Sequence, residues 1–300
     1  MFVAPGRETF FAFPSSILGD KYTLTVFLPT EVAPISQHYP VVYFVGLDRS
    51  DREKFQQFAK ENGVFLAGLF IPEEDMETVS DKLADFVSLE WIPYMDTNYA
   101  TKATAANRIL AASGEKSARA VMKIFANGNF GALSLLNPGT DFSGLSLQNA
   151  QRVYVRGTQE ELAAAASVLV QSRQYGRQYA FEYADEDAGW LGALNMKYLL
   201  AAADDLKVKK LLLYPGTKTI ANLPGKSISL RVYAKLTNGL ETVFVPQEIR
   251  MSPPFLDWQP SMGMLRVRAG AELGSVKITV NVDNVENSAK ILLKNNKKGS

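Results

Sequence analysis

The side chains that could carry nucleophilic catalysis are sparsely supplied in this sequence, which has one histidine, His38, and no cysteine. A serine or cysteine nucleophile needs a base beside it, usually a histidine, to accept its proton. The single histidine therefore argues against a Ser-His-Asp or Cys-His hydrolase. The lack of cysteine also excludes disulfides, thiolate nucleophiles and zinc sites built on cysteine.

Two acidic runs, Glu73-Glu74-Asp75 and Asp185-Glu186-Asp187, could hold calcium or magnesium. A calcium loop also needs spaced ligands and a glycine turn, and neither run has that pattern. Acidic residues are also favoured at helix N-termini, where they interact favourably with the helix dipole. We therefore expect solvated loops and helix starts here, and we predict no metal site and no cofactor.

The segment Ser113-Gly114-Glu115 could bind an anion, because a loop that opens a helix presents free amide N–H groups. Glu115 in the first turn would repel an anion, which favours a structural role. His38 is expected at the entrance of a strand and partly exposed, with a ligand or pH-sensing role as the weaker reading. Trp258 follows Pro253-Pro254 in a stretch typical of a loop, so it is the best candidate for a ligand-binding surface.

The composition is that of an ordinary globular protein, with 47% hydrophobic residues in a chain of 300, enough for two domains. Lys and Arg (32) nearly balance Asp and Glu (31), so the charge gives no reason to expect nucleic acid or an anionic membrane as the partner. The sequence contains no run of about 18 apolar residues, so no transmembrane helix is predicted. The first residues also lack the basic-then-apolar layout of a signal peptide.

The elements that must position any site alternate between strand and helix from about residue 9 to 205. This alternation indicates a mostly parallel sheet with helices on both faces. The continuous apolar run at 40–46 is typical of a strand that is covered on both sides. We expect strands at 22–28, 40–46, 63–71, 108–112, 132–136, 152–155 and 178–183, and helices at 51–61, 74–97, 115–126, 159–173 and 188–203.

The pattern changes at Asp204-Asp205, beyond which short strands alternate with turn residues such as Pro215-Gly216 and Asn238-Gly239. Strands at this regular spacing suggest a small β-sandwich. We therefore predict two domains, residues 1–205 and 206–300. The strands expected in the second are 208–214, 227–235, 241–250, 263–268, 275–282 and 288–294.

Three segments of the first part carry a family resemblance: Ser16–Pro29, His38–Gly46 and Glu90–Tyr99, which reads EWIPYMDTNY. They resemble the opening strands, the strand before the oxyanion loop, and the helix end before the nucleophile strand of one esterase family. That family of α/β-hydrolases includes esterase D-like, feruloyl esterase-like and enterochelin esterase-like proteins. The order and spacing of the segments fit over about 200 residues.

This resemblance implies an α/β-hydrolase fold, with the Gly-x-Ser-x-Gly nucleophile turn directly after the strand at 108–112. The best alignment puts Gly114 at the nucleophile position. Glycine tolerates the strained backbone of that turn but supplies no hydroxyl. Shifting the frame would make Ser113 or Ser117 the nucleophile, but Glu115 would then stand where the turn needs a small residue.

The resemblance also implies an acid after the strand that ends near Gly157 and a histidine within Asp185–Trp190. The first stretch continues Thr-Gln-Glu-Glu over 158–161, where a glutamate could orient an imidazole. The second contains no histidine, and His38 lies before the third strand. All three triad positions therefore depart from the family pattern.

The second part resembles the bacterial Ig-like domains of exported and surface proteins, through Lys226–Gly239, Gly263–Ala269 and Gly274–Val280. We predict a non-catalytic esterase-like protein with a binding, scaffolding or assembly role. Its expected location is periplasmic, secreted or at the cell surface, with a signal peptide absent from this chain, and its expected partner is a protein or a cell-surface assembly. One alternative is a carboxylic-ester or polysaccharide ester hydrolase that uses Ser113 or Ser117. Another is a carbohydrate-binding protein with Trp258 as its platform.

Overall fold

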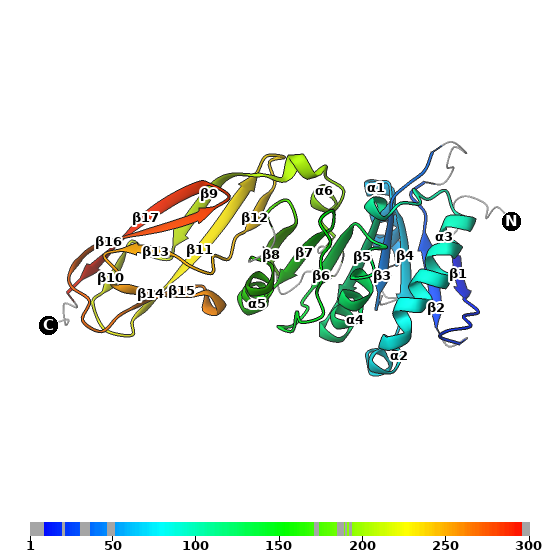
Figure 1. Cartoon of the computed structure of the whole chain (residues 1–300), viewed down its shortest axis with the longest axis horizontal. Coiled ribbons are helices and arrows are strands. Elements are labelled where there is room, and N and C mark those ends of the chain that lie inside the picture. The colour runs from blue at the N-terminus through cyan, green and yellow to red at the C-terminus, as the bar shows by residue number, and fades with distance from the viewer. Residues whose placement is uncertain are drawn as a thin grey trace. The chain divides into compact units, whose positions relative to one another are not determined.

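The chain divides into two compact units, which are treated separately below. A computed structural model describes residues 9–19, 22–30, 37–46, 52–170, 174–184, 189, 191 and 194–295. The first unit comprises Met1–Arg156 and Ala184–Leu200, and the second comprises Gly157–Tyr183 and Ala201–Ser300. Figure 1 labels their helices and strands.

The first unit is built on one sheet, whose strands are β1 (Thr9–Ala12), β2 (Thr23–Phe27), β3 (Val41–Val45), β4 (Phe65–Phe70), β5 (Arg108–Ser113), β6 (Ala132–Leu136) and β7 (Arg152–Gly157). Their order across the sheet is β1-β2-β4-β3-β5-β6-β7. The pairs from β4 through β7 are parallel, and β1 and β2 add an antiparallel edge. The predicted mostly parallel sheet is therefore confirmed.

Burial follows the sequence pattern closely in the central strands. All five side chains of β3 are buried, as are all five of β6, because helices and loops cover both faces of the sheet. Figure 1 shows α2, α3 and α4 on the side of the sheet that faces the viewer. The helices of this unit are α1 (Arg52–Asn62), α2 (Glu73–Asp85), α3 (Ile92–Asn98), α4 (Glu115–Phe125) and the short α6 (Met196–Leu199).

The long helix expected over 74–97 forms as three joined pieces. A π-helical segment, Phe86–Trp91, connects α2 to α3. The amide of Ile92 donates to the carbonyl of Val87. Pro93 is tolerated because it lies in the first turn of α3, where an amide hydrogen is dispensable.

The helix predicted over 188–203 is wrong in extent. Within its described residues the chain forms only α6, followed by a turn and a 3₁₀ turn at Ala203–Leu206. The side chain of Asn195 accepts a hydrogen bond from the amide of Tyr198 at 3.2 Å, which caps α6 inside the expected helix. An asparagine that bonds to the backbone in this way starts a new helix instead of continuing one.

The second unit contains the remaining strands and α5 (Gln159–Leu169). One sheet has the order β8-β12-β11-β15-β14, with β9 also on β11, and a four-stranded sheet has the order β10-β17-β16-β13. β11 alternates buried and open side chains along most of its length, the pattern of a strand with one face in a core. The bounds are β8 (Tyr179–Tyr183), β9 (Val208–Pro215), β10 (Thr219–Ala221), β11 (Ser227–Leu236), β12 (Glu241–Val243), β13 (Arg250–Ser252), β14 (Leu256–Gln259), β15 (Met264–Val267), β16 (Gly274–Val282) and β17 (Val285–Lys294).

The division into units places residues 157–183 and 201–205 with the later strands, whereas the boundary was expected at residue 205; the first of these segments contains α5 and β8. β8 pairs with β12, with Phe181 opposite Val243. The amide of the Gln159 side chain donates to the carbonyl of Pro260 at 2.6 Å, which ties α5 to the turn after β14. Interleaved segments of this kind cannot be detected from a change of composition at Asp204-Asp205.

The single strand expected over 241–250 is in fact two, β12 and β13, which belong to different sheets. Pro246 lies between them and cannot donate a hydrogen bond to a ladder. β10 and β14 were not predicted. Among the residues that the structure describes, no helix is long and apolar enough to cross a bilayer.

Candidate functional site

The turn between β5 and α4 is the centre of the candidate site. Gly114 links the two elements with φ +84° and ψ 159°, and its amide donates to the carbonyl of Leu136 at 2.9 Å. Side chains rarely adopt this positive φ, so the turn favours glycine. A β-carbon on Gly114 would meet no atom within 4 Å, which shows open space where a side chain would stand.

A pocket of about 500 Å³ opens beside this turn. Its walls combine an apolar strip at the end of β4 with polar groups at the start of α4. Because neighbouring parallel strands end at the same sheet edge, the ends of β3, β4 and β5 meet here. The lining residues are Gly46, Phe70, Ile71, Pro72, Glu74, Ser113, Gly114, Lys116 and Ser117.

The pocket therefore brings Ser113, Gly114 and Ser117 together, the three residues proposed for the nucleophile position. Ser117 is buried, with 8% of its surface exposed. Its hydroxyl oxygen lies 2.8 Å from the point where a β-carbon on Gly46 would stand. Ser113 ends β5 and is half-buried.

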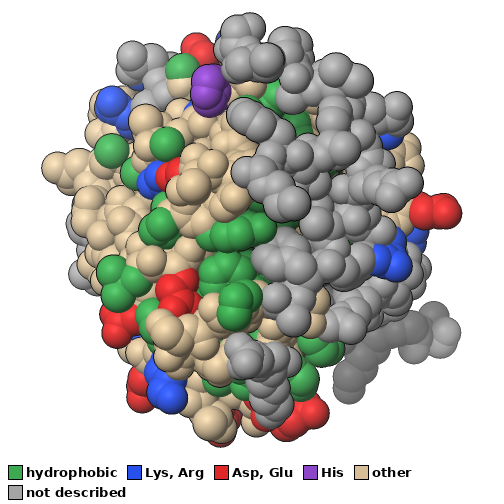
Figure 2. Space-filling model, turned by 90° about the vertical axis from the view of Figure 1, so that its right-hand side faces the viewer, with side chains coloured by type: hydrophobic (Ala, Val, Ile, Leu, Met, Phe, Trp, Pro, Cys, Tyr) green, Lys and Arg blue, Asp and Glu red, His purple; other side chains and the backbone are tan. Residues whose placement is uncertain are grey.

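The lone histidine does not reach this pocket. His38 is exposed just before β3, and Figure 2 shows it in purple on the surface. Gly46 and the pocket lie at the other end of β3. Five strand residues at about 3.3 Å each put at least about 16 Å between the two ends. His38 therefore cannot act as the base for Ser113 or Ser117 within this fold.

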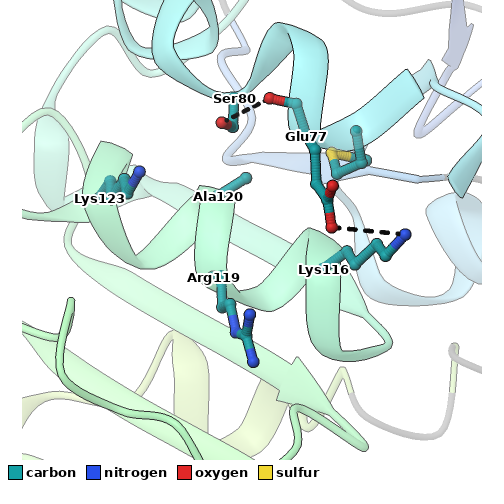
Figure 3. Close-up of a pocket in the computed structure, with 7 residues that line it drawn as sticks. Glu77, Ser80, Lys116, Arg119, Ala120 and Lys123 are labelled. Carbon is teal, nitrogen blue, oxygen red and sulfur yellow. Dashed lines mark hydrogen bonds and ion pairs between the residues drawn. The ribbon is translucent and has the colours of Figure 1, made fainter. Parts of the chain in front are cut away.

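Charges around the start of α4 are arranged in ion pairs. Lys116 lines the pocket and its ammonium nitrogen lies 3.6 Å from a carboxylate oxygen of Glu77 on α2. Figure 3 shows this pair at the rim of a second, smaller pocket of about 250 Å³ between α2 and α4. Lys116 lines both pockets. The smaller one is lined by Met76, Glu77, Ser80, Lys116, Arg119, Ala120 and Lys123.

Glu115 is the residue that the sequence suggested would repel an anion, but its carboxylate points elsewhere. It pairs with Arg119 one helical turn later. Its side chain also lies against Gly139, within 3 Å of where a β-carbon on that glycine would stand. Glu115 is exposed and does not line the pocket.

One of the two glutamates in the stretch suggested for a replacement acid, Glu161, has a structural role. The amide of Thr158 donates to the Glu161 carboxylate at 2.7 Å, and the amide of Glu161 donates to the Thr158 hydroxyl at 3.3 Å. This reciprocal arrangement is a capping box at the start of α5. It accounts for Glu161 without any catalytic role.

The other predicted site residues lie apart from the pocket. The stretch Asp185–Trp190 falls outside the described residues except for Gly189. Trp258 lies on β14, not in the expected loop, and its indole N–H donates to the carbonyl of Pro246 at 2.6 Å. Glu74 lies in the first turn of α2 and lines the pocket, but among the described residues no group of three or more acidic or histidine side chains could hold a metal ion.

Sequence analysis missed the contributions of Gly46 and Lys116 to the pocket. A glycine that ends a fully buried parallel strand is a usable signal, because ligands gather at the carboxyl edge of such sheets. The side chain of Lys116 gave no comparable signal. Its position depends on Glu77, a partner on another helix.

Comparisons with known proteins identify the fold. A scan against protein-family models gave no match, and a search of curated proteins gave none. FphF, a fluorophosphonate-binding serine hydrolase from Staphylococcus aureus, matches with a TM-score of 0.51 and 12% identity, over 66% of this chain and 100% of that chain. The enterobactin esterase from Shigella flexneri matches with a TM-score of 0.52 and 11% identity, over 66% of this chain and 60% of that chain.

A third structure, the ferric enterobactin esterase from Salmonella typhimurium, matches with a TM-score of 0.51 and 13% identity. The match covers 66% of this chain and 59% of that chain. This chain therefore spans about six-tenths of the length of the two enterobactin esterases. At such identities the likeness concerns the fold alone, and this fold is α/β-hydrolase-like.

Proposed function

We propose that this chain is a non-catalytic protein on an esterase-like scaffold, and that the pocket beside Gly114 binds a ligand or a partner. One observation carries the proposal: the turn between β5 and α4 keeps a positive φ but holds a glycine with no side chain. A fold that presents its nucleophile at this turn loses covalent catalysis when the residue is glycine.

Two further observations support the absence of catalysis. His38 is exposed at the far end of β3, and Glu161 is engaged in the capping box of α5. Removing members of a catalytic triad leaves only the small rate enhancement that comes from binding. A pocket without these groups is suited to recognition of a ligand or a partner.

The proposal extends to the C-terminal strands, residues 206–300, as an Ig-like sandwich that joins the chain to a larger assembly outside the cytoplasm. Its support is the match of Lys226–Gly239 to such domains and the inward-outward alternation of β11 and β16. The expected partner is a protein or a cell-surface assembly.

One observation favours a rival function, ester hydrolysis through Ser117. This buried serine lines the same pocket and stands close to Gly46 at the end of β3. Ser113 is the other fallback nucleophile, because it lines the pocket beside Gly114. Neither serine has a histidine base within reach in the described residues.

The experiment that separates the two functions combines a fluorophosphonate probe with short-chain aryl esters. We expect no labelling of the folded chain and no turnover above buffer, while an active serine hydrolase treated in parallel is labelled. Ser113→Ala and Ser117→Ala should then change nothing. Labelling or turnover that disappears in either variant would show an enzyme and refute the non-catalytic function.

A further inference from the structure

We infer that the open face of β9 and β11 in the second unit is a binding surface for an acidic polysaccharide, which its basic side chains attract and its tyrosine rings contact. The inference rests on the proposed function in one respect, because it names the chemistry of the partner expected for the C-terminal strands. The surface, called the β9–β11 face, consists of Lys209, Lys210, Tyr214, Arg231, Tyr233 and Lys235.

The whole chain is nearly neutral, but its charges are divided unequally between its parts. Residues 206–300 contain 15 lysines and arginines and only six aspartates and glutamates, whereas residues 1–205 contain 17 and 25. The C-terminal strands are therefore strongly basic at neutral pH. A basic segment joined to an acidic one indicates an anionic partner for the basic segment.

Three lysines gather at one end of the β9–β11 face. Lys210 lies directly opposite Lys235, and the register shifts by one residue just beyond this pair. The shift is a β-bulge, and it explains why the consecutive residues Lys209 and Lys210 are both exposed. The residues on either side of them, Val208 and Leu211, are buried. Like charges directly opposite each other destabilise a sheet, so this gathering of lysines indicates a role other than stability.

Neighbouring carboxylates do not neutralise these lysines. In the described part of the chain, none of the three forms an ion pair. The nearest acidic position in the ladder is Glu241 on β12, opposite Lys235, and no ion pair joins the two. One carboxylate is also too few to balance three ammonium groups. An anionic ligand would supply the missing counter-charge.

Tyrosine rings occupy the rest of the β9–β11 face. The ring centroid of Tyr233 lies 5.8 Å from that of Tyr214 on β9 and 6.4 Å from that of Tyr183 on β8. Tyr214 is 54% exposed. Arg231 lies opposite Tyr214, and its guanidinium carbon is 5.4 Å from the centroid of the Tyr183 ring. This cation–π contact holds the arginine among the rings, so charge and apolar surface are presented together.

The geometry of the rings favours a sugar chain over single-stranded nucleic acid, whose bases stack in succession on open ring faces. The Tyr233 ring is inclined by 73° to Tyr214 and by 77° to Tyr183, so the three form no continuous stacking platform. The exposed hydroxyls of Ser227 and Ser229 continue the same side of β11. Inclined rings and hydroxyl groups suit the C–H and hydroxyl groups of a sugar.

The β9–β11 face is long enough for more than one sugar. Arg231 and Lys235 are four residues apart on β11, a separation of about 13 Å at about 3.3 Å per residue. A polymer with repeated anionic groups can contact both ends at once, which raises its affinity above that of a single sugar. The expected ligand is therefore a polymer.

This surface is distinct from the sugar platform predicted at Trp258. Trp258 lies opposite Leu265, which lies opposite Ile228 on β11. Ile228 is buried, whereas Arg231 and Lys235 are exposed. Trp258 therefore belongs to the other face of the sheet.

The test is biolayer interferometry of the full chain on immobilised polygalacturonate and chondroitin sulfate, with dextran as the neutral counterpart. We expect saturable binding of an acidic polymer that weakens as salt rises, and no binding of dextran. The two acidic polymers distinguish recognition of carboxylates alone from recognition of sulfates. Absence of saturable binding to both would overturn the inference.

Lys210→Gln combined with Lys235→Gln should weaken this binding by at least about tenfold, because two charged contacts are lost. Tyr214→Ala should weaken it by about fivefold and leave its salt dependence unchanged, because the contact of the ring is apolar. Circular dichroism and thermal unfolding would check that the variants are folded. The double lysine variant should be no less stable than the original chain, since it removes a like-charge pair.

Lys277→Gln combined with Lys290→Gln is the matched control. These two lysines are also exposed and directly opposite each other, on β16 and β17, so the variant loses the same charge. It should weaken binding by less than about twofold, because charges outside the contact are screened by salt. Equal losses in the two double variants would show attraction by overall charge and overturn the surface.

Single-stranded oligo(dT) tests the choice of polymer. Tighter binding of oligo(dT) than of either acidic polysaccharide, at equal concentration of charged groups, would assign the β9–β11 face to nucleic acid and overturn the inference. Weaker binding of oligo(dT) is the expected result.

These outcomes are distinct from failure of the proposed function. Fluorophosphonate labelling that Ser117→Ala abolishes would refute the non-catalytic function and leave polysaccharide binding in place, because the two sets of residues lie in different units. Absence of both labelling and polysaccharide binding would overturn the β9–β11 surface and leave the non-catalytic function standing.

Discussion

The hydroxyl of Ser117 on α4 and the backbone of Gly46 after β3 are packed so closely that a β-carbon on Gly46 would lie 2.8 Å from the serine oxygen. The contact joins the end of the third strand to the first turn of the helix that follows the fifth. Gly46 also has φ +86°, a conformation that favours glycine. The close packing of α4 against the end of β3 therefore requires a glycine at position 46.

Gly46→Ala should destabilise the first unit for two separable reasons. The positive φ alone costs about 1–2 kcal/mol for a residue with a β-carbon, and the contact with Ser117 adds to it. Ser117→Ala alone should change stability by less than about 1 kcal/mol, because it leaves the backbone of α4 unchanged and alanine favours helix.

The two changes should couple. In the Ser117→Ala background, Gly46→Ala should cost about 1 kcal/mol less than in the original chain, because the nearest remaining atom, the β-carbon of residue 117, lies at 3.6 Å. Urea unfolding of the four proteins measures this difference. An equal loss of unfolding free energy on Gly46→Ala in both backgrounds would show that the contact with the Ser117 hydroxyl does not contribute to the destabilisation.

A second prediction concerns the ion pair of Asp96 on α3 with Arg108 on β5, whose atoms lie 2.5 Å apart. The side chains are only 20% and 12% exposed, and Asp96 also accepts a hydrogen bond from Thr101 at 2.6 Å. Asp96→Ala would leave the arginine charge in a largely buried place. We expect a loss of about 2–3 kcal/mol, less than for a fully buried pair.

Asp81→Ala is the matched control for this pair. Asp81 lies 3.5 Å from Lys123, but its side chain is 90% exposed. Exposed pairs contribute little, so the control should stay within about 0.5 kcal/mol of the original chain. Similar losses in the two variants, measured by urea unfolding, would contradict the assigned difference in burial.

The pH dependence of stability should carry a contribution from Glu90. Burial alone would raise the pKa of this carboxyl, but hydrogen bonds from Ser15 and Ser16 outweigh it, and the pKa lies below its ordinary value of 4.5. The hydroxyls of Ser15 and Ser16 each donate at 2.5 Å, and the amide of Ser16 donates at 2.9 Å. A lowered carboxyl pKa stabilises the folded state above the unfolded pKa.

That stabilisation should therefore be complete above about pH 5 and decline as the pH falls below 4.5 toward the lower pKa of the folded protein. Glu90→Gln should remove this part of the pH dependence, and Ser16→Ala should reduce it. Unfolding curves of the three proteins between pH 3 and 7 measure the effect. Parallel curves for Glu90→Gln and the original chain would contradict it.

The sequence predicted those elements whose pattern is local. Val41–Val45 is apolar throughout because both faces are covered, and Gly114 interrupts the chain between a strand and an amphipathic helix. Predictions failed where a distant partner decides the structure. β14 forms because it pairs with β15, and the short stretch around Trp258 contains no signal for that pairing.

The pocket shows the same limit. Gly114 and Ser117 are close in sequence and could be singled out as a possible nucleophile region. The approach of Ser117 to Gly46 depends on β3 and β5 pairing in register, with Val45 opposite Ala112. No local pattern specifies this register. The role of Glu161 could have been predicted, because Thr-x-x-Glu before an apolar run is the sequence signature of a capping box.

Glu161 thus offers a final prediction that distinguishes a helix cap from a catalytic acid. Thr158→Ala should destabilise the start of α5 by about 1 kcal/mol, because it removes the acceptor for the amide of Glu161. Glu161→Gln should be nearly neutral, since glutamine also serves in a capping box, whereas Glu161→Ala should weaken the helix start.

Hydrogen exchange of the α5 amides, followed by mass spectrometry, measures these effects locally. Faster exchange in Thr158→Ala and Glu161→Ala, with Glu161→Gln close to the original chain, is the expected order. A role as a catalytic acid would show in activity and not in exchange, because a glutamine cannot carry the negative charge that stabilises an imidazolium. Glu161→Gln would then abolish an esterase activity while leaving the exchange of α5 unchanged.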